Sequence, residues 1–232
     1  MTVSFSPLGD QAIVVQLSDQ IDEQTEKHIR KLSTLLENRP PQWLVEVIPA
    51  FITVTVFYDP CMALYNDVKT ELTELLTQLG QDLPVESRTI EIPVCYGGDF
   101  GPDLEFVAQH NHLTTRQVID IHTSGNYSVH MIGFAPGFPF IGGMSDKIAA
   151  PRRETPRLRI PERTVGIAGM QTGVYPIETP GGWQLIGRTP IRLFLPEKEI
   201  PSLLRAGDQI VFKEISKAQY MAWEEDLHAE NS

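Results

Sequence analysis

The sequence predicts a mixed fold, α/β plus mainly β, in which a small amino-terminal α/β domain precedes a β domain that forms a barrel or a sandwich. Up to about residue 86, strand-like runs alternate with segments whose apolar residues recur at helical spacing. Residues 131–190 then contain 10 Gly and 8 Pro in 60 positions, against 7 Gly and 10 Pro in the other 172. That composition excludes long helices there and favours short strands joined by rigid turns.

The amino-terminal part is predicted to be a compact ββαββα unit. Residues 3–17 predict a hairpin around the turn Pro7–Asp10, because the run after the turn is apolar and β-branched. Runs rich in Val, Thr and aromatic residues predict two more strands, and apolar residues at helical spacing predict two helices. The strands are expected at 45–48 and 53–58, and the helices at 22–38 and about 63–79, the second stopped by Gly80.

A polar stretch from Asp82 to Ser87 separates two parts of different composition. Such a stretch is typical of a linker between domains. We therefore expect an amino-terminal α/β domain in residues 1–86 and a β domain in residues 87–232.

The second part begins with a predicted strand at 89–96, a turn at Gly97–Asp99 and two short helices. Capping-box spacing at Thr114–Gln117 opens the second helix, and Gly125–Asn126 stops it. Ordinary patterns return after residue 190. They predict strands at 191–194 and 209–212, a helical turn at 200–205 and a polar carboxyl end after Ser216.

Composition excludes several classes of protein. A formal net charge of -11, without a long basic arm or basic helix, argues against binding to nucleic acid. No apolar run approaches the roughly 20 residues that span a bilayer, and the chain does not open with the basic and apolar segments of a leader. Cys61 and Cys95 lie far apart, each without a nearby Cys or paired His, which favours free thiols over a disulfide or a zinc site. We expect a cytoplasmic protein that binds neither nucleic acid nor a membrane.

Charge is distributed unevenly along the chain. Residues 1–88 carry 6 Lys and Arg against 13 Asp and Glu, whereas residues 131–190 carry 7 against 4. Because Arg offers a rigid fork to carboxylate or phosphate and Pro restrains the loop, this segment predicts an anionic small-molecule or phosphate ligand. An equally weighted alternative is a solvated basic loop or a surface that meets an acidic partner. Five of its cations alternate with prolines: Arg152, Arg153, Arg157, Arg159 and Arg163.

Three motif segments supply further candidate ligand contacts. The loop at 133–140 alternates glycine, proline and phenylalanine, so Phe134, Pro136 and Phe138 are candidates for a hydrophobic wall. The alternative is a packed barrel corner with the Phe side chains in the core. Segments 165–176 and 179–190 add an amide, a phenol, an aromatic ring for stacking and a cation for an anion. The alternative is that their glycines serve only turns and that the Trp is a core residue. These candidates are Gln171, Tyr175, Trp183 and Arg188.

Several familiar catalytic motifs are absent from the sequence. It has no phosphate-binding G-x-x-x-x-G-K-[ST] loop, no strand-coupled G-x-G-x-x-G, no G-x-S-x-G elbow and no H-E-x-x-H, so independent ATP hydrolysis is not indicated. The catalytic residues therefore stay open. Four histidines, at 110, 112, 122 and 130, lack the i, i+4 pairing of a metal site, and we expect non-metal roles for them. His122, just before the motif loop, is kept as a candidate site residue.

Four strings occur in order along the chain: GFAPGFPFIGGM, PRRETPR, VGIAGMQTGVYP and PGGWQLIGRTP. Together they closely resemble the family of the B subunit of 5-oxoprolinase, also called the allophanate hydrolase subunit 1 family or the sporulation kinase inhibitor family. The resemblance extends to Pro7–Asp10 and Tyr58–Pro60, and so covers essentially the whole chain. It implies that the β domain is a cyclophilin-like β-barrel. The isomerase active-site pattern is missing, so isomerase activity is not expected.

The resemblance also implies partners and a reaction. In this family the B subunit pairs with the C subunit, and together with the A subunit they convert 5-oxoproline to L-glutamate with hydrolysis of ATP, so the chain is expected to be inactive alone. ATP is expected as a co-substrate, with magnesium and shared with the C subunit, and no tightly bound cofactor is expected. Arg157 and Arg188 are expected to neutralise carboxylate or phosphate, while the loop from Phe134 to Phe138 and Trp183 shape the pocket.

Two other readings of the same resemblance stay open. The chain can be an inhibitor that docks on the dimerisation helices of a sporulation histidine kinase and blocks autophosphorylation, with an exposed Phe-rich patch as its docking surface. It can also be a purely structural component, with every catalytic group on the C subunit. The fine ligand contacts are open too, because Pro161–Thr164 and Phe140–Ile141 depart from the family pattern.

Overall fold

A computed structural model describes residues 3–77 and 88–230. The chain divides into two compact units, residues 1–87 and 88–232. The predicted linker at 82–87 and the predicted helix stop at Gly80 lie outside the described residues. Within them, no helix combines the length and the apolar character needed to cross a membrane.

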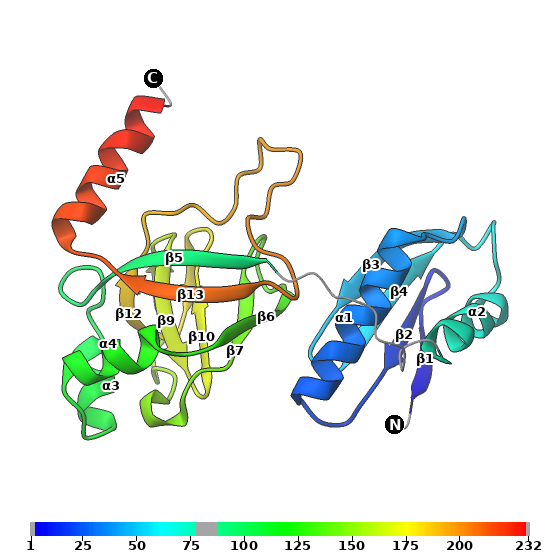
Figure 1. Cartoon of the computed structure of the whole chain (residues 1–232), viewed down its shortest axis with the longest axis horizontal. Coiled ribbons are helices and arrows are strands. Elements are labelled where there is room, and N and C mark those ends of the chain that lie inside the picture. Colours follow the sequence, from blue (N-terminus) through cyan, green and yellow to red (C-terminus); the bar gives the residue numbers. More distant parts are fainter. Residues whose placement is uncertain (1–2, 78–87, 231–232) are drawn as a thin grey trace. The chain divides into compact units, whose positions relative to one another are not determined.

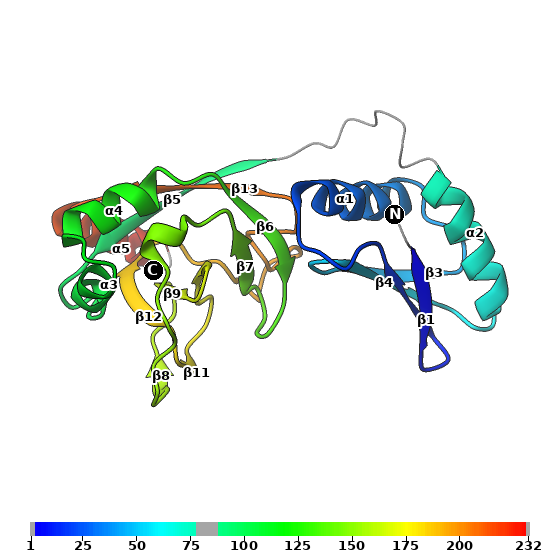
Figure 2. The same cartoon turned by 90° about the horizontal axis from the view of Figure 1, so that it is seen from below.

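The first unit is a four-stranded antiparallel sheet with two helices, in the predicted ββαββα order (Figure 1). Its strands follow the spatial order β1-β2-β4-β3, and α1 packs across the sheet (Figure 2). Asp22 accepts the Thr25 N–H at 2.7 Å and so caps α1. The elements are β1 (Ser4–Leu8), β2 (Ala12–Gln16), α1 (Glu23–Asn38), β3 (Leu44–Pro49), β4 (Thr53–Tyr58) and α2 (Tyr65–Thr77).

The second unit is built around a closed barrel, which confirms the barrel alternative for the Gly- and Pro-rich segment. The seven strands follow one another around the barrel in the order β10-β7-β6-β13-β5-β12-β9. β13 pairs in parallel with β5, and the two lie side by side in Figure 1. The barrel strands are β5 (Thr89–Tyr96), β6 (Tyr127–Ile132), β7 (Pro139–Gly142), β9 (Thr164–Ala168), β10 (Gln171–Val174), β12 (Gln184–Arg188) and β13 (Gln209–Glu214).

Short elements surround the barrel strands. Helix α4 begins with the predicted capping box between Thr114 and Gln117. A separate two-stranded sheet pairs β8 with β11 outside the closed barrel (Figure 2). These elements are α3 (Leu104–His110), α4 (Thr115–Thr123), the 3₁₀ helix η2 (Asp146–Ile148), β8 (Arg157–Ile160), β11 (Thr179–Gly181) and α5 (Lys217–Glu230).

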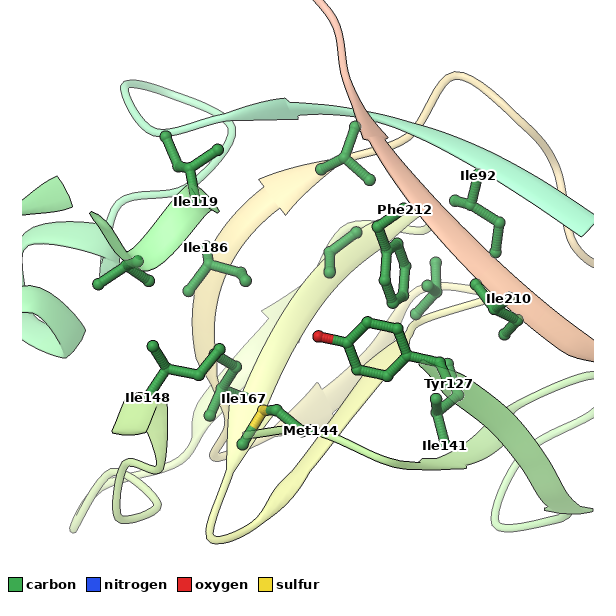
Figure 3. Packing of buried hydrophobic residues seen from close by; sticks show 14 of the residues in the cluster. Ile92, Ile119, Tyr127, Ile141, Met144, Ile148, Ile167, Ile186, Ile210 and Phe212 are labelled. Atoms are coloured by element: carbon green, nitrogen blue, oxygen red, sulfur yellow. The ribbon is translucent and has the colours of Figure 1, made fainter. Parts of the chain in front are cut away.

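Two separate hydrophobic cores hold the two units. In the first, side chains such as Ile13, Leu32 and Val56 fill the space between sheet and helices. In the second, inward-facing side chains fill the barrel, among them Tyr127 and Phe212 at a ring distance of 5.0 Å (Figure 3). The barrel interior is therefore packed with side chains.

Two predictions for the carboxyl-terminal part are wrong, and one helix there is not predicted. Residues 191–194 form no strand, because only Phe194 makes an isolated bridge, to Ser202. Residues 200–205 form no helical turn, since the carbonyl of Pro201 accepts the Leu195 N–H and the segment runs as a loop. The end after Ser216, for which the sequence predicts only a polar character, forms helix α5.

Candidate ligand site on the outer face of the barrel

Five aromatic side chains gather on the second unit, and we call them the aromatic cluster: Phe134, Phe138, Phe140, Tyr175 and Trp183. Phe138 lies at the centre, with ring centroids 5.4 Å from Tyr175 and 5.7 Å from Trp183, both edge to face. Phe134 and Phe140 contact Phe138 at 5.5 and 5.3 Å. Edge-to-face pairs of this kind stabilise one another beyond simple burial. The structure thus brings together four predicted site residues from three different motif segments.

The aromatic cluster lies on the outer face of the barrel wall. Alternate residues of a strand face opposite sides, and Val165 and Ile167 of β9 belong to the barrel interior whereas Ala168 packs with the cluster. On β10 and just beyond it, Val174 faces inward and Tyr175 outward. The cluster is therefore a second, smaller apolar centre outside the packed interior.

Two glycines allow the rings to approach the backbone closely. A Cβ atom on Gly173 would lie 3.0 Å from the Trp183 ring and 3.2 Å from the Phe138 ring. A Cβ atom on Gly181 would lie 2.6 Å from the Tyr175 hydroxyl oxygen and 2.8 Å from Ile160. At these two positions, glycine serves close packing and not only a turn.

The loop at 133–140 buries one phenylalanine and exposes another. Phe138 is 2% exposed, whereas Phe134 is 70% exposed and has a φ of 68°. The loop is closed by a hydrogen bond from Gly133 N–H to the Phe138 carbonyl at 3.0 Å, and Pro136 lies exposed between them. A left-handed backbone at a bulky residue costs free energy and marks a position for functional study. The loop thus has both predicted characters, a packed corner and an exposed apolar surface.

Tyr175 contributes a buried phenol to the aromatic cluster. Burial raises the pKa of Tyr175 to about 12, although Arg152, the Trp183 backbone and Arg157 act in the opposite direction. The side chain is therefore a neutral hydroxyl near pH 7 and can donate a hydrogen bond.

Two arginines meet a buried carboxylate beside the aromatic cluster. Arg157 Nη2 donates to Asp103 Oδ1 at 2.8 Å, and Arg153 Nη1 donates to the same oxygen at 3.3 Å. Arg157 also pairs across the sheet with Gly181, where an added Cβ atom would lie 2.6 Å from the Tyr175 hydroxyl oxygen. Asp103 was not predicted as a site residue. Its signal in the sequence is only an acid at a helix start, where it reads as an N-cap.

Arg188 and Gln171 make no hydrogen bond to this arginine pair among the described contacts. Arg188 is at the opposite end of β12 from Leu185, which bonds to Asp103, and its Nε donates to the Glu162 carbonyl at 3.1 Å. Gln171 starts β10, opposite Ala168, and is partly exposed. The contacts found in residues 88–230 therefore do not join Arg157 and Arg188 into one clamp.

His122 lies inside the barrel unit and not with the aromatic cluster. It is fully buried, with Nδ1 2.8 Å from the Tyr96 hydroxyl and Nε2 2.9 Å from Thr172 Oγ1. Because Thr172 donates its own proton to the Gly166 carbonyl at 3.1 Å, it accepts from His122 Nε2–H, and Nδ1 accepts from Tyr96. Burial lowers the pKa of His122 to about 3. These contacts describe a neutral histidine that stabilises the interior.

Other candidate places do not coincide with the predicted site residues. A pocket of about 360 Å³ lies in the first unit, next to the start of α1, and none of the predicted residues lines it. Across residues 3–77 and 88–230, no group of three or more His, Cys, Asp or Glu side chains is arranged to hold a metal ion. Cys61 is exposed and Cys95 buried, and both are free thiols. The aromatic cluster with its arginines is therefore the candidate ligand site.

The chain is similar to several known proteins over nearly its whole length. It is 49% identical to the B subunit of 5-oxoprolinase from Bacillus subtilis (strain 168), over 97% of this chain and 99% of that protein. It is 43% identical to the B subunit of 5-oxoprolinase from Escherichia coli O157:H7, over 88% of this chain and 93% of that protein. These relatives confirm the family resemblance that the motifs predict.

A solved structure extends the comparison of the fold. The Kluyveromyces lactis urea carboxylase matches with a TM-score of 0.76 and 20% identity, over 97% of this chain and 23% of that much longer chain. At this identity the likeness shows the fold alone. The carboxyltransferase domain family, subdomain C and D, matches residues 3–204. The chain therefore belongs to the carboxyltransferase domain family, subdomain C and D, and its relatives there include proteins named as the B subunit of 5-oxoprolinase.

Proposed function

We propose that the chain is the B subunit of an ATP-dependent 5-oxoprolinase and acts with the A and C subunits to convert 5-oxoproline to L-glutamate. The observation that carries this proposal is the 49% identity to a protein of that name, over 97% of this chain and 99% of the relative. Similarity over both full lengths means that the chain corresponds to the whole relative and not to a shared module. The assembly is a cytoplasmic hetero-oligomer, and the chain alone is inactive.

The chemistry of the substrate explains the need for ATP. The amide of 5-oxoproline lies in an unstrained ring and is a poor electrophile, so it requires activation before water can open it. ATP, bound with magnesium and shared with the C subunit, supplies this activation: its γ-phosphoryl group is transferred to the amide oxygen with release of ADP, and phosphate leaves after water has opened the ring. The protein must then bind charged groups, namely the phosphates of ATP and the carboxylate of 5-oxoproline.

The aromatic cluster and its arginines suit such ligands. Phe138, Tyr175 and Trp183 are buried and form the base of an apolar wall, and a small ring meets its exposed part. Arg157 supplies the anion contact at the edge of this wall. In this proposal Phe134 and Pro136 extend the wall into solvent, and Gln171 and Arg188 contact the ligand or a partner protein from the rims of β10 and β12.

The assembled enzyme tests these roles. We expect Arg157→Ala to reduce 5-oxoproline-dependent ATP hydrolysis about 10- to 100-fold, because a charge-assisted contact to an anion contributes about 1.5–3 kcal/mol. Arg159→Ala is the matched control, since Arg159 lies on the same strand but is exposed and pairs with Glu178. Full activity of the Arg157 variant would remove the anion site from the proposal. Full activity of the A and C subunits without this chain would contradict the proposed function itself.

A further inference from the structure

The carboxylate of Asp103 does not serve the helix that it precedes. Asp103 stands at the N-cap position of α3, yet its side chain makes no capping hydrogen bond. The carboxylate is nearly buried, with the residue 5% exposed, and Oδ2 accepts the Leu185 N–H at 2.7 Å. Its other oxygen accepts from Arg157 and Arg153. Asp103 therefore joins β12 to two arginines.

The same two arginines are held at the edge of the aromatic cluster by their backbones. Arg153 N–H donates to the Gly182 carbonyl at 2.7 Å, and Arg157 pairs with Gly181. Gly181 and Gly182 lead directly into Trp183 of the cluster. Each arginine is thus held at two points. Its backbone pairs with the segment that leads into Trp183, and its guanidinium group binds the Asp103 carboxylate, which is bound to β12.

The carboxylates close to these arginines in the structure or the sequence do not fully neutralise them. Arg152, Arg153 and Arg157 stand against Asp103 and the exposed Glu154, which leaves a net charge of about +1. The side chains of Arg153 and Arg157 are 39% and 24% exposed. Arg157 Nη1 is buried and has no hydrogen-bond partner in the described residues. An anionic oxygen can therefore meet the two arginines only at the exposed parts of their side chains.

We infer that Asp103 is a positioning residue, which holds Arg153 and Arg157 so that the exposed parts of their side chains meet an anionic group of the ligand beside the aromatic cluster. The anion is a phosphate of ATP or the carboxylate of 5-oxoproline, which share this chemistry. A guanidinium that is fixed before the ligand arrives loses less freedom on binding, so the contact is stronger. This inference rests on the proposed function and adds to it a residue that does not itself touch the ligand.

Asp208 provides a matched control elsewhere in the second unit. It is 1% exposed, accepts the Arg205 N–H at 2.9 Å and binds the Arg88 guanidinium, with Nε at 2.9 Å. Asp103→Asn and Asp208→Asn each replace a buried, arginine-bound carboxylate by a neutral group of the same shape. Both variants lose thermal stability, whereas only the first alters arginines of the proposed site.

The experiment measures KM and kcat of the assembled enzyme for both substrates. For Asp103→Asn we expect a rise of about tenfold in one KM, with kcat changed less than about threefold. A rise in the KM for ATP assigns the anion to phosphate, and a rise in the KM for 5-oxoproline assigns it to the carboxylate. Asp208→Asn leaves both KM values unchanged. Unchanged KM values in Asp103→Asn, or equal changes in the two variants, would overturn the inference.

A binding measurement separates this inference from the proposed function. If the assembled enzyme works equally well without the chain, the proposed function fails, and the chain is then titrated alone with ATP and with 5-oxoproline. Trp183 reports on binding by fluorescence once Trp43→Phe and Trp223→Phe have removed the other two tryptophans. Binding that is about tenfold weaker in Asp103→Asn than in Asp208→Asn supports the positioning role. No saturable binding by the parent chain, or equal binding by the two variants, contradicts it.

Discussion

His122 shows how a residue next to a motif can serve the interior and not a ligand. Its place in the sequence, just before the Phe-rich loop, predicts a site residue. Its partners Tyr96 and Thr172 come from β5 and β10, far from it in sequence. Those partners could not be read from the sequence, because barrel closure alone brings the two strands and helix α4 together.

The buried neutral His122 predicts a loss of stability in mild acid. Its pKa is about 3 in the folded chain, below the ordinary value of 6.5, so protons bind better to the unfolded chain. The contribution of the neutral His122 to the free energy of unfolding is complete above pH 6.5 and is lost as the pH falls toward 3. Between pH 7 and pH 5 we expect His122 to lower the free energy of unfolding by about 2 kcal/mol. Chemical unfolding at both pH values checks this.

The comparison protein for this measurement is His122→Gln, which cannot take up a proton. It is expected to be less stable at pH 7 but to lose about 2 kcal/mol less than the parent chain between pH 7 and pH 5. An identical pH dependence in both proteins would show that other groups, such as His28, cause the loss.

The sequence predicts most of the aromatic cluster but not Asp103, the carboxylate that holds the arginines beside it. Phe134, Phe138, Tyr175 and Trp183 stand in glycine-rich motifs whose aromatic residues are visible without a structure. Asp103 looks like an ordinary helix cap, and only the tertiary fold reveals that its carboxylate turns to Arg157.

The close approach of Gly181 to the Tyr175 hydroxyl predicts that substitutions at these two residues have coupled effects on stability. In Gly181→Ala the new methyl group would lie 2.6 Å from that oxygen, so we expect a loss of about 1–3 kcal/mol in the free energy of unfolding. In the Tyr175→Phe background, the loss shrinks by about 1 kcal/mol because the oxygen is gone. A double-mutant cycle measures this, and additive losses would mean that Ile160, not Tyr175, meets the methyl group.

At the scale of elements, the sequence predicts well the strands in which apolar and polar residues alternate and the helices that begin with a capping residue. It does not predict α5. The strands at 53–58 and 89–96 have the predicted bounds, as has the capping box of α4. In α5 the apolar residues Tyr220, Met221 and Trp223 do not form one stripe, so periodicity gives no signal. Long-range contacts to the barrel unit hold this helix.

Helix α5 is attached to the barrel unit by ring contacts and ion pairs, and Lys217 at its start pairs with Asp99 at 3.5 Å. Tyr220 packs against Phe100 with ring centroids 4.4 Å apart, and Arg163, 9% exposed, binds Glu224. Glu224→Gln leaves the buried guanidinium with only the longer ion pair to Glu162 at 3.6 Å, and we expect a loss of about 1–3 kcal/mol and faster amide exchange in α5. Glu225→Gln, one position on and exposed, is the control and keeps the exchange rates of the parent chain. Equal exchange in both variants would show that the ion pair does not hold the helix.

At the scale of the whole molecule, the two separate cores suggest two independent domains. Each unit has its own cluster of buried side chains, and composition alone placed a boundary between 86 and 87. We expect a fragment of residues 88–232 to fold cooperatively by itself, with the circular dichroism of a β-rich protein. A fragment that binds hydrophobic dye and unfolds without a transition would show that the barrel depends on the first unit.

The central claim concerns the assembled enzyme, and a titration tests it most directly. The purified A and C subunits are held fixed, this chain is added in increasing amounts, and glutamate released from 5-oxoproline in the presence of ATP is measured. The account predicts a rate that is near zero without the chain, rises in proportion to it and saturates at a fixed ratio to the C subunit. A rate that does not change with added chain would contradict the account, and inhibition of histidine kinase autophosphorylation by the same preparation would then assign it a regulatory role.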